Sequence, residues 1–205
     1  MNCKCSGISV IKWPFLAFFC TFVSRFIIME TIHSETYSRN TVEFVTVAAE
    51  FCAYMEQAAA KERGEFVDTL LKLLPLLYLK AALLTASGTE DDAYAELEQF
   101  VSEDDYDAIR SMAAAILGEQ DDYLDVFVED MKYSDTPIKK NISEDLADIY
   151  QDLRNFIGVY RLGHDESMAL ALAEVIEHFR YYWGQTLVNT MRALHDVKYN
   201  QGIDA

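Results

Sequence analysis

Histidine can transfer protons near neutral pH and bind metal ions, so the four histidines are the first candidates for chemistry in this 205-residue sequence. His178 and His195 fall in one long helix-patterned segment near the C-terminus. Seventeen residues separate them, or about 25 Å along a helix axis, so they cannot share a metal ion. Glu174 lies four residues before His178, the smallest beginning of a metal-ligand pair. Because the helical angles turn both histidines to the polar side, we interpret Glu174 and His178 as a solvent-exposed pair.

Other catalytic patterns are missing from the sequence. A di-iron carboxylate bundle needs two Glu-x-x-His pairs on different helices, and the helix-patterned part of the chain lacks them. There is no Gly-x-Ser-x-Gly elbow, phosphate-cradling glycine loop or dinucleotide-binding fingerprint. Cys52 falls on the apolar side of a predicted helix, where a thiol packs as a small hydrophobic group. The sequence therefore predicts no catalytic, cofactor-binding or metal-binding residues and favours a protein that is not an enzyme.

Acidic residues gather in two stretches. Residues 90–107 hold nine among eighteen, and residues 121–135 hold six among fifteen, interleaved with aromatic residues. Acidic and aromatic side chains together indicate a face that docks a cationic peptide or protein. The other interpretation is a solvated surface whose acids suit the first turns of helices. The candidate interaction face in the second stretch consists of Asp121, Asp122, Tyr123, Asp125, Glu129, Asp130 and Tyr133.

The net charge narrows the range of partners. The chain carries a formal charge of −17, and its first 28 residues hold three basic and no acidic residues, which leaves −20 for residues 29–205. This charge repels phosphate backbones and anionic lipid surfaces. It argues against nucleic acid as a partner and favours a protein partner that is basic.

Residues 1–28 differ from the rest of the chain. They are basic, and they contain an apolar run from Trp13 to Val23. Three interpretations remain open, namely translation that starts at Met29, a membrane anchor formed by residues 8–28, and a cleaved signal peptide. The abrupt change of composition favours a start at Met29. We therefore expect a cytoplasmic protein, with an inner-membrane anchor as the alternative.

The remainder of the chain is helix-patterned almost throughout, because apolar residues recur every three or four positions. The first predicted helix begins at an Asn40 cap, with Glu43 at its third position, and ends before Gly64. The second, residues 65–84, is largely apolar, turns one polar edge to solvent and should kink at Pro75. The pattern of both helices is typical of a bundle.

Later segments complete the helical pattern. Ser102, with Asp105 at the third helical position, predicts a helix start, and Gly118 predicts its end. Ser143 is the expected cap of a later helix. The remaining predicted helices cover residues 89–101, 102–117, part of 121–135, 143–160 and about 165–198.

The last predicted helix contains a glycine in its interior. Gly184 follows Trp183, and a mid-helix glycine costs about 1 kcal/mol relative to alanine. Either another helix crosses closely at this point or a groove opens beside Trp183. The expected inward stripe of this helix is Leu172, Ile176, Phe179, Trp183, Leu187, Met191 and Leu194.

These elements predict an all-α fold. Six or seven helices with short connections and no convincing strand form a single compact bundle. Residues 1–28 are an apolar leader, and residues 29–205 form one acidic helical domain. Helices that bury one side and expose the other explain every strong signal, so we expect no buried polar cluster that demands a reactive role.

Several runs of the sequence resemble a known family. Residues 37–40, 42–52, 127–137 (FVEDMKYSDTP), 143–156 (SEDLADIYQDLRNF) and 183–195 are similar to a Bacteroidetes family of domains of unknown function, DUF5063. The resemblance covers about residues 37–200 and leaves the leader out, which supports a start at Met29. It implies a compact helical protein without an assigned activity.

Three functions are compatible with these features. The leading hypothesis is a non-enzymatic module that binds a basic protein through its acidic face. A chaperone-like adaptor is the first alternative, with an apolar groove near Pro75 and Trp183. A metal-dependent hydrolase that uses Glu174 and His178 is the second.

Overall fold

The computed structural model describes residues 35–85, 97–125 and 138–200. The predicted all-α fold is confirmed, with a small β-hairpin added. The leader, Glu129, Asp130, Tyr133 and most of the helix predicted over residues 89–101 lie outside the described residues. The described elements are α2 (Arg39–Gln57), α3 (Arg63–Ala82), α4 (Glu103–Leu117), β1 (Asp122–Leu124), β2 (Lys139–Asn141), α5 (Ile142–Leu162), α6 (Asp165–His178) and α7 (Gly184–Tyr199).

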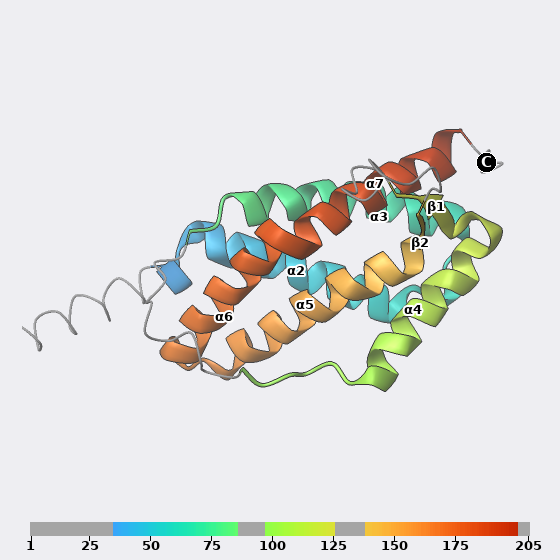
Figure 1. Ribbon diagram of the computed structural model, residues 1–205. Coiled ribbons are helices and arrows are strands. Elements are labelled where there is room, and N and C mark those ends of the chain that lie inside the picture. Colours follow the sequence, from blue (N-terminus) through green and yellow to red (C-terminus); the bar gives the residue numbers. More distant parts are fainter. Residues whose placement is uncertain (1–34, 86–96, 126–137, 201–205) are drawn as a thin grey trace, which may run out of the picture.

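Helix α5 organises the bundle. It packs against α4, α6, α2 and α7, while α3 packs against α2 and α7. In Figure 1, α6 and α7 follow one another along the molecule, and each of them packs against α5. A single turn of π-helix, Phe179–Trp183, joins them. The long last helix predicted from the sequence therefore exists, but it changes its hydrogen-bond pattern in the middle.

The first helix starts at a different cap from the one expected. Ser38 is the N-cap of α2, and its Oγ accepts a hydrogen bond from the Thr41 backbone N–H at 3.2 Å. Asn40 lies inside the first turn, and its side chain donates to the Leu83 carbonyl at 3.2 Å. Gly64 does not end this helix but lies in the first turn of α3. Serine and asparagine are nearly equal as caps, so the sequence alone does not choose between them.

Helix α4 has the ends that the sequence predicts. Ser102 and Asp105 form a capping box, with 3.2 Å from the Asp105 N–H to Ser102 Oγ. Gly118 follows the helix at φ +60°. Residues 97–101, however, carry no helical assignment, so the prediction that this stretch is helical up to Val101 is wrong for these five residues.

The short helix predicted within residues 121–135 is wrong where the structure describes it. Asp122–Leu124 form strand β1, which pairs antiparallel with β2, with Tyr123 opposite Lys140. The strand forms because residues 15 to 19 positions further along the chain pair with it. Helical periodicity carries no information about such a partner.

The core centres on Trp183. Its ring is fully buried and lies 4.8 Å from the Phe179 ring and 6.4 Å from the Phe44 ring, measured between centroids. Its Nε1 donates to the Val175 carbonyl at 3.2 Å. Leu172, Ile176, Leu187 and Leu194 of the expected stripe are also buried.

One edge of α3 is more apolar than expected. Glu65 and Lys72 are exposed as predicted, but Leu76, Leu79 and Leu83 are 41%, 54% and 45% exposed on the same side of the helix. Among the described helices, none combines the length and the hydropathy that crossing a bilayer demands.

Candidate functional site

The hairpin closes the N-terminal end of α5. Asp121 is buried, although it belongs to the predicted interaction face. Its Oδ1 accepts from the Ser143 N–H at 2.7 Å, and its Oδ2 accepts from Ser143 Oγ at 2.6 Å. The helix begins at Ile142, and its N-cap residue, Asn141, makes no side-chain capping hydrogen bond. Asp121, twenty-two residues before Ser143 in the sequence, caps the helix instead. Ser143, which the sequence predicts as the N-cap, lies in the first turn of α5.

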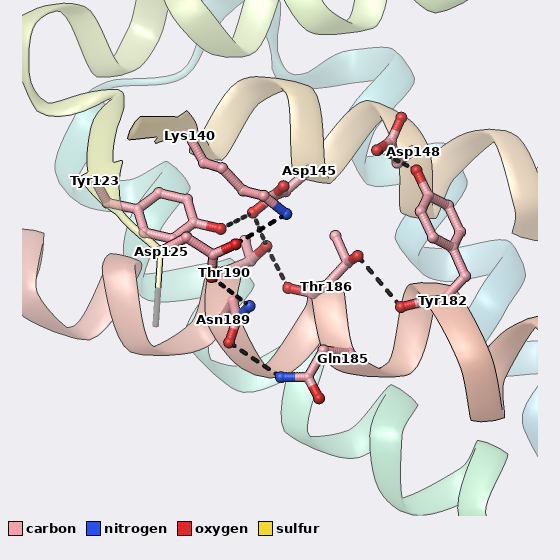
Figure 2. Close-up of polar contacts among 10 residues, drawn as sticks. All are labelled: Tyr123, Asp125, Lys140, Asp145, Asp148, Tyr182, Gln185, Thr186, Asn189 and Thr190. Carbon is pink, nitrogen blue, oxygen red and sulfur yellow. Dashed lines mark hydrogen bonds and ion pairs between the residues drawn. The ribbon is translucent and has the colours of Figure 1, made fainter. Parts of the chain in front are cut away.

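Asp145 on α5 is a carboxylate in the protein interior. Its Oδ2 accepts hydrogen bonds from the Tyr123 hydroxyl at 2.5 Å and from Thr190 Oγ1 at 3.1 Å. Burial raises the pKa of Asp145 to about 6, although the Tyr123 hydrogen bond and the Lys140 charge oppose this shift. Burial and the hydrogen bond to Asp145 also raise the pKa of Tyr123. Figure 2 shows these side chains converging from the hairpin, α5 and α7.

Asp125 forms a second buried acid beside the first. Its Oδ1 accepts from Asn189 Nδ2 at 3.2 Å, and its Oδ2 lies 3.3 Å from Lys140 Nζ. Asn189 in turn accepts from Gln185 Nε2 at 3.4 Å. We call Asp121, Asp125 and Asp145, with their hydrogen-bonding partners, the acid cluster.

The sequence predicts no buried polar cluster that demands a reactive role; the acid cluster is buried and polar, and its acids are hydrogen-bonded within the described chain. Ionisable side chains from the hairpin and α5 converge, with polar partners from α7. The sequence contained a weak signal for it. Asp145 stands on the inner side of an otherwise apolar helix face, and Asn189 and Thr190 interrupt the inner face of α7.

Two more acids extend along α5. Asp148 accepts from the Tyr106 hydroxyl at 2.7 Å and from the Tyr182 hydroxyl at 2.6 Å. Asp152 Oδ1 lies 2.9 Å from His178 Nδ1. The acids at 145, 148 and 152 share one helix face because three and four residues separate them. His178 is exposed, as the sequence predicts, but it pairs with Asp152 across the helix interface.

A cavity lies between the hairpin and α7. This hairpin pocket has a volume of about 570 Å³. Tyr123 and Asn189 line this pocket. The Tyr123 hydroxyl donates a hydrogen bond to the buried Asp145, and the Asn189 side chain donates one to the buried Asp125. The other polar lining residues are Gln120, Asp122, Arg192, His195, Asp196 and Asn200.

The structure buries some residues of the predicted interaction face and leaves others exposed. Asp121 and Asp125 are buried and bonded internally. Asp122 is exposed, and its carboxylate lies 2.6 Å from Lys139 Nζ. Tyr123 is half-buried. Of this face, therefore, Asp122 and Tyr123 reach the hairpin pocket, and the pocket residues on α7 were not predicted as part of it.

The described ranges contain several histidine, aspartate and glutamate side chains and the buried Cys52. No group of three or more histidine, cysteine, aspartate or glutamate side chains is arranged to hold a metal ion there. Cys52 is buried, and burial raises the pKa of its thiol. The predicted packing role of Cys52 is therefore confirmed.

The fold and the site together define an acidic helical-bundle protein with a buried carboxylate and tyrosine cluster beneath a small hairpin. The chain belongs to the DUF5063 family of domains of unknown function, whose model matches residues 35–200. This confirms the resemblance predicted for residues 37–200.

A solved structure is also similar. It is that of protein BF1032 from Bacteroides fragilis, at 49% sequence identity and a TM-score of 0.70. The similarity covers 82% of this chain and 98% of that protein's chain. No curated protein matches the sequence.

Proposed function

We propose that this protein is a non-enzymatic cytoplasmic module that binds a basic segment of a protein partner in the hairpin pocket. The pocket itself carries the proposal. Its volume of about 570 Å³ falls in the range of ligand-binding sites, which combine apolar walls with a few fixed polar groups. Leu124, Ile142 and Val197 supply apolar wall here.

The acid cluster supports binding rather than catalysis. Tyr123 and Thr190 both donate to Asp145, and Asn189 and Lys140 both contact Asp125. Acids that are satisfied by their own chain hold the pocket wall rigid, because a buried network with all its hydrogen bonds made is costly to break. A rigid wall lowers the entropy lost on binding.

The charge of the chain supports a basic partner. The field of a protein with a net charge of −17 accelerates encounters with cations. Asp122 and Asp196 bring two carboxylates to the pocket lining and Arg192 brings one positive charge; Asp122 is also paired with Lys139. In this proposal Asp122 and Tyr123, two residues of the predicted interaction face, contact the partner from the pocket lining.

Co-purification from the native host tests the proposal. The tagged chain is captured at about 0.05 M and about 0.5 M salt, and bound proteins are identified by mass spectrometry. The pocket variant is Asp122→Asn with Asp196→Asn. The control is Glu50→Gln with Glu166→Gln, which makes the same charge change at exposed positions on α2 and α6.

We expect a basic protein that is retained at low salt and lost at high salt. The pocket variant should lose it, and the control should retain it. Thermal unfolding by circular dichroism verifies that both variants fold. A partner that the folded pocket variant holds as firmly as the wild type would refute the assignment of the pocket.

The adaptor is a second candidate, because exposed leucines on α3 follow Pro75. Leu76, Leu79 and Leu83 offer an apolar surface to an unfolded client. The adaptor hypothesis also expected an apolar groove beside Trp183. That expectation gains no support, because the Trp183 ring is fully buried and a Cβ atom at Gly184 would overlap Phe179. If Leu76→Ser with Leu79→Ser abolishes capture of a client and the pocket variant does not, the adaptor is favoured. The hydrolase alternative requires stoichiometric metal in the purified protein.

A further inference from the structure

Helices α3 and α7 lie side by side and run in opposite directions (Figure 1). Near one end of the pair, Lys198 on α7 donates a hydrogen bond to Asp68 on α3. Near the other end, the Tyr78 ring on α3 lies 5.2 Å from the ring of Phe179, in the π turn that precedes α7. The outward sides of the two helices therefore form one continuous surface.

This surface is apolar on both helices. Tyr78 and Leu79 on α3 are 40% and 54% exposed, and Val188 and Tyr199 on α7 are 45% and 60% exposed. A hollow of about 450 Å³ lies between the helices, with Leu71 on its α3 side. Exposed apolar side chains that gather in one place mark interaction sites, whereas single scattered ones do not. We call this surface the α3/α7 face, and it consists of Lys72, Tyr78, Leu79, Val188, Arg192 and Tyr199.

The charge of these two helices is opposite in sign to that of the chain. Together α3 and α7 hold five lysine and arginine residues and three acidic residues, a net charge of +2, whereas the whole chain carries −17. The hollow has Arg192 and His195 in its described lining and no acidic residue. Asp68 beside it is already paired with Lys72 and Lys198. The α3/α7 face is thus a positive, apolar surface on an acidic protein.

Arg192 is the cation of this face that its own chain leaves available. It is exposed, and its guanidinium makes no hydrogen bond or ion pair among the described residues. Lys72 is also exposed, although it shares Asp68 with Lys198. Because the helices are antiparallel and Asp68 meets Lys198, Lys72 and Arg192 stand at about the same level of the pair. They place one positive charge on each helix beside the hollow.

A complementary partner combines an apolar strip with carboxylates on its borders. An amphipathic helix has this form, and such helices commonly lay their apolar side into a groove between other helices. Helix α7 has sixteen residues, or a length of about 24 Å, so the groove beside it accommodates several turns of an added helix. Salt screens charges that lie more than about 10 Å apart. The local positive charge therefore outweighs the distant acids of the chain once such a helix has docked.

We propose that the α3/α7 face docks an amphipathic helix of a partner protein whose apolar stripe is flanked by glutamate or aspartate. Its apolar side chains cover Tyr78, Leu79 and Val188, and its carboxylates pair with Lys72 and Arg192. This surface does not depend on the binding of a basic segment in the hairpin pocket, although Arg192 lines both hollows.

Nuclear magnetic resonance of the ¹⁵N-labelled full chain tests this proposal. The probes are three synthetic peptides of about eighteen residues, or five helical turns. They share one leucine stripe and differ only in its flanking residues, which are glutamate, glutamine or lysine. The glutamate peptide should give saturable shifts of the Leu71, Leu79, Val188 and Arg192 amides. The glutamine peptide should bind there about tenfold more weakly, because two ion pairs are lost, and the lysine peptide should not bind there.

A charge variant and its control locate the ion pairs. Arg192→Gln with Lys72→Gln should weaken binding of the glutamate peptide about tenfold and leave that of the glutamine peptide unchanged. The control, Arg110→Gln with Arg161→Gln, removes the same two charges from α4 and α5. It should bind both peptides as the wild type does.

An apolar variant locates the stripe. Leu79→Ser with Val188→Ser should abolish binding of the glutamate and glutamine peptides, while Leu162→Ser, at an exposed position at the end of α5, should not. The amide spectrum verifies that each variant folds. The pocket variant, Asp122→Asn with Asp196→Asn, should bind the glutamate peptide at least as tightly as the wild type, so the two proposals fail separately.

Other occupants of the face give different results. Sedimentation velocity of the chain alone, at up to about 0.5 mM, detects a second copy, and co-sedimentation with phosphatidylglycerol vesicles detects a lipid surface. A dimer, or vesicle binding, that Leu79→Ser with Val188→Ser abolishes would overturn the proposal. Equal affinity for the glutamate and glutamine peptides would also overturn it, as would unchanged affinity in the folded charge variant.

Discussion

At the scale of single residues, Asp145 and Asp68 are carboxylates with opposite pKa shifts. Burial raises the pKa of Asp145 to about 6. Asp68 lies on α3, and hydrogen bonds from Lys198 and Lys72 lower its pKa to about 2. Desolvation decides the first case and neighbouring charge the second. At neutral pH the ionised Asp145 therefore destabilises the folded state, and the ionised Asp68 stabilises it.

The Asp145→Asn variant should change the pH dependence of stability. The pKa of Asp145 is about 6 in the folded state and near 3.8 in the unfolded chain. The stability that protonation of Asp145 gives the folded state is therefore fully present below pH 3.8 and is lost as the pH rises through about 6. The wild type should thus lose up to about 3 kcal/mol relative to the variant between pH 4 and pH 7. Urea unfolding across that range measures the difference.

Asp68→Asn is the control for this experiment and should show the opposite sign. The lowered pKa of Asp68 contributes stability above pH 3.8 that is lost as the pH falls through about 2. If the wild type and Asp145→Asn have parallel stability curves between pH 4 and pH 7, the burial of an ionised Asp145 is refuted.

The cap from Asp121 should have a measurable effect on stability. Asp121→Ala removes two acceptors of hydrogen bonds from Ser143, and we expect a loss of about 2 kcal/mol in the free energy of unfolding. Asp121→Asn keeps an acceptor for the Ser143 N–H and should lose less. Glu119→Ala, at a nearby exposed position, should change stability by less than about 0.5 kcal/mol. Urea unfolding of the three variants tests the cap, and equal losses would contradict it.

At the scale of elements, the π turn explains the glycine in the last helix. The Gly184 N–H bonds to the Phe179 carbonyl five residues earlier, which brings that oxygen close to Gly184 Cα. A Cβ atom at Gly184 would lie 2.2 Å from the Phe179 oxygen and 2.8 Å from its ring. The glycine is therefore explained by close contact with the preceding turn of its own helix, and not by another helix that crosses there, as one of the two explanations from the sequence supposed.

The Gly184→Ala variant should be less stable than the wild type, although a glycine-to-alanine change inside a helix usually increases stability. In an ordinary helix interior alanine is more stable than glycine by about 1 kcal/mol. Here we expect a loss of about 2 kcal/mol or more, since the new methyl group overlaps backbone. Val188→Ala, at an exposed position on α7, is the control. Thermal unfolding that shows Gly184→Ala to be as stable as the wild type would refute the π turn.

At the scale of the whole molecule, the described core draws on nearly the whole of the described chain. Its described buried members extend from Phe44 to Val197, and the family model begins at residue 35. Contacts just before α2 also matter, because Tyr160 donates to the Thr36 carbonyl at 2.8 Å. The Tyr37 hydroxyl donates to Asp165 at 3.2 Å.

Because the family model begins at residue 35, we expect a chain that starts at Met29 to unfold at the same urea concentration as the full-length chain. A chain that starts at Thr41 should be less stable, because it loses the Ser38 cap and the contacts of Thr36 and Tyr37. Urea unfolding followed by circular dichroism compares the three chains. A lower midpoint for the Met29 chain would show that residues 1–28 contribute to the folded state.

The sequence by itself determined the helical class, the family and the ends of α4. These follow from local rules, since helical periodicity, the Ser102 capping box and the Gly118 stop act within a few residues. It also placed Leu172, Leu187 and Leu194 on the buried side of the last helix.

Only the tertiary structure decided which polar residues meet. Asp121 caps α5 across the hairpin, Thr190 reaches Asp145 over forty-five positions of sequence, and His178 reaches Asp152 over twenty-six. A pattern read along the chain shows which side of a helix is polar, but not which other helix faces it. Burial therefore turned acids of an apparent surface stretch into interior hydrogen-bond acceptors, because desolvation depends on neighbours that folding brings together.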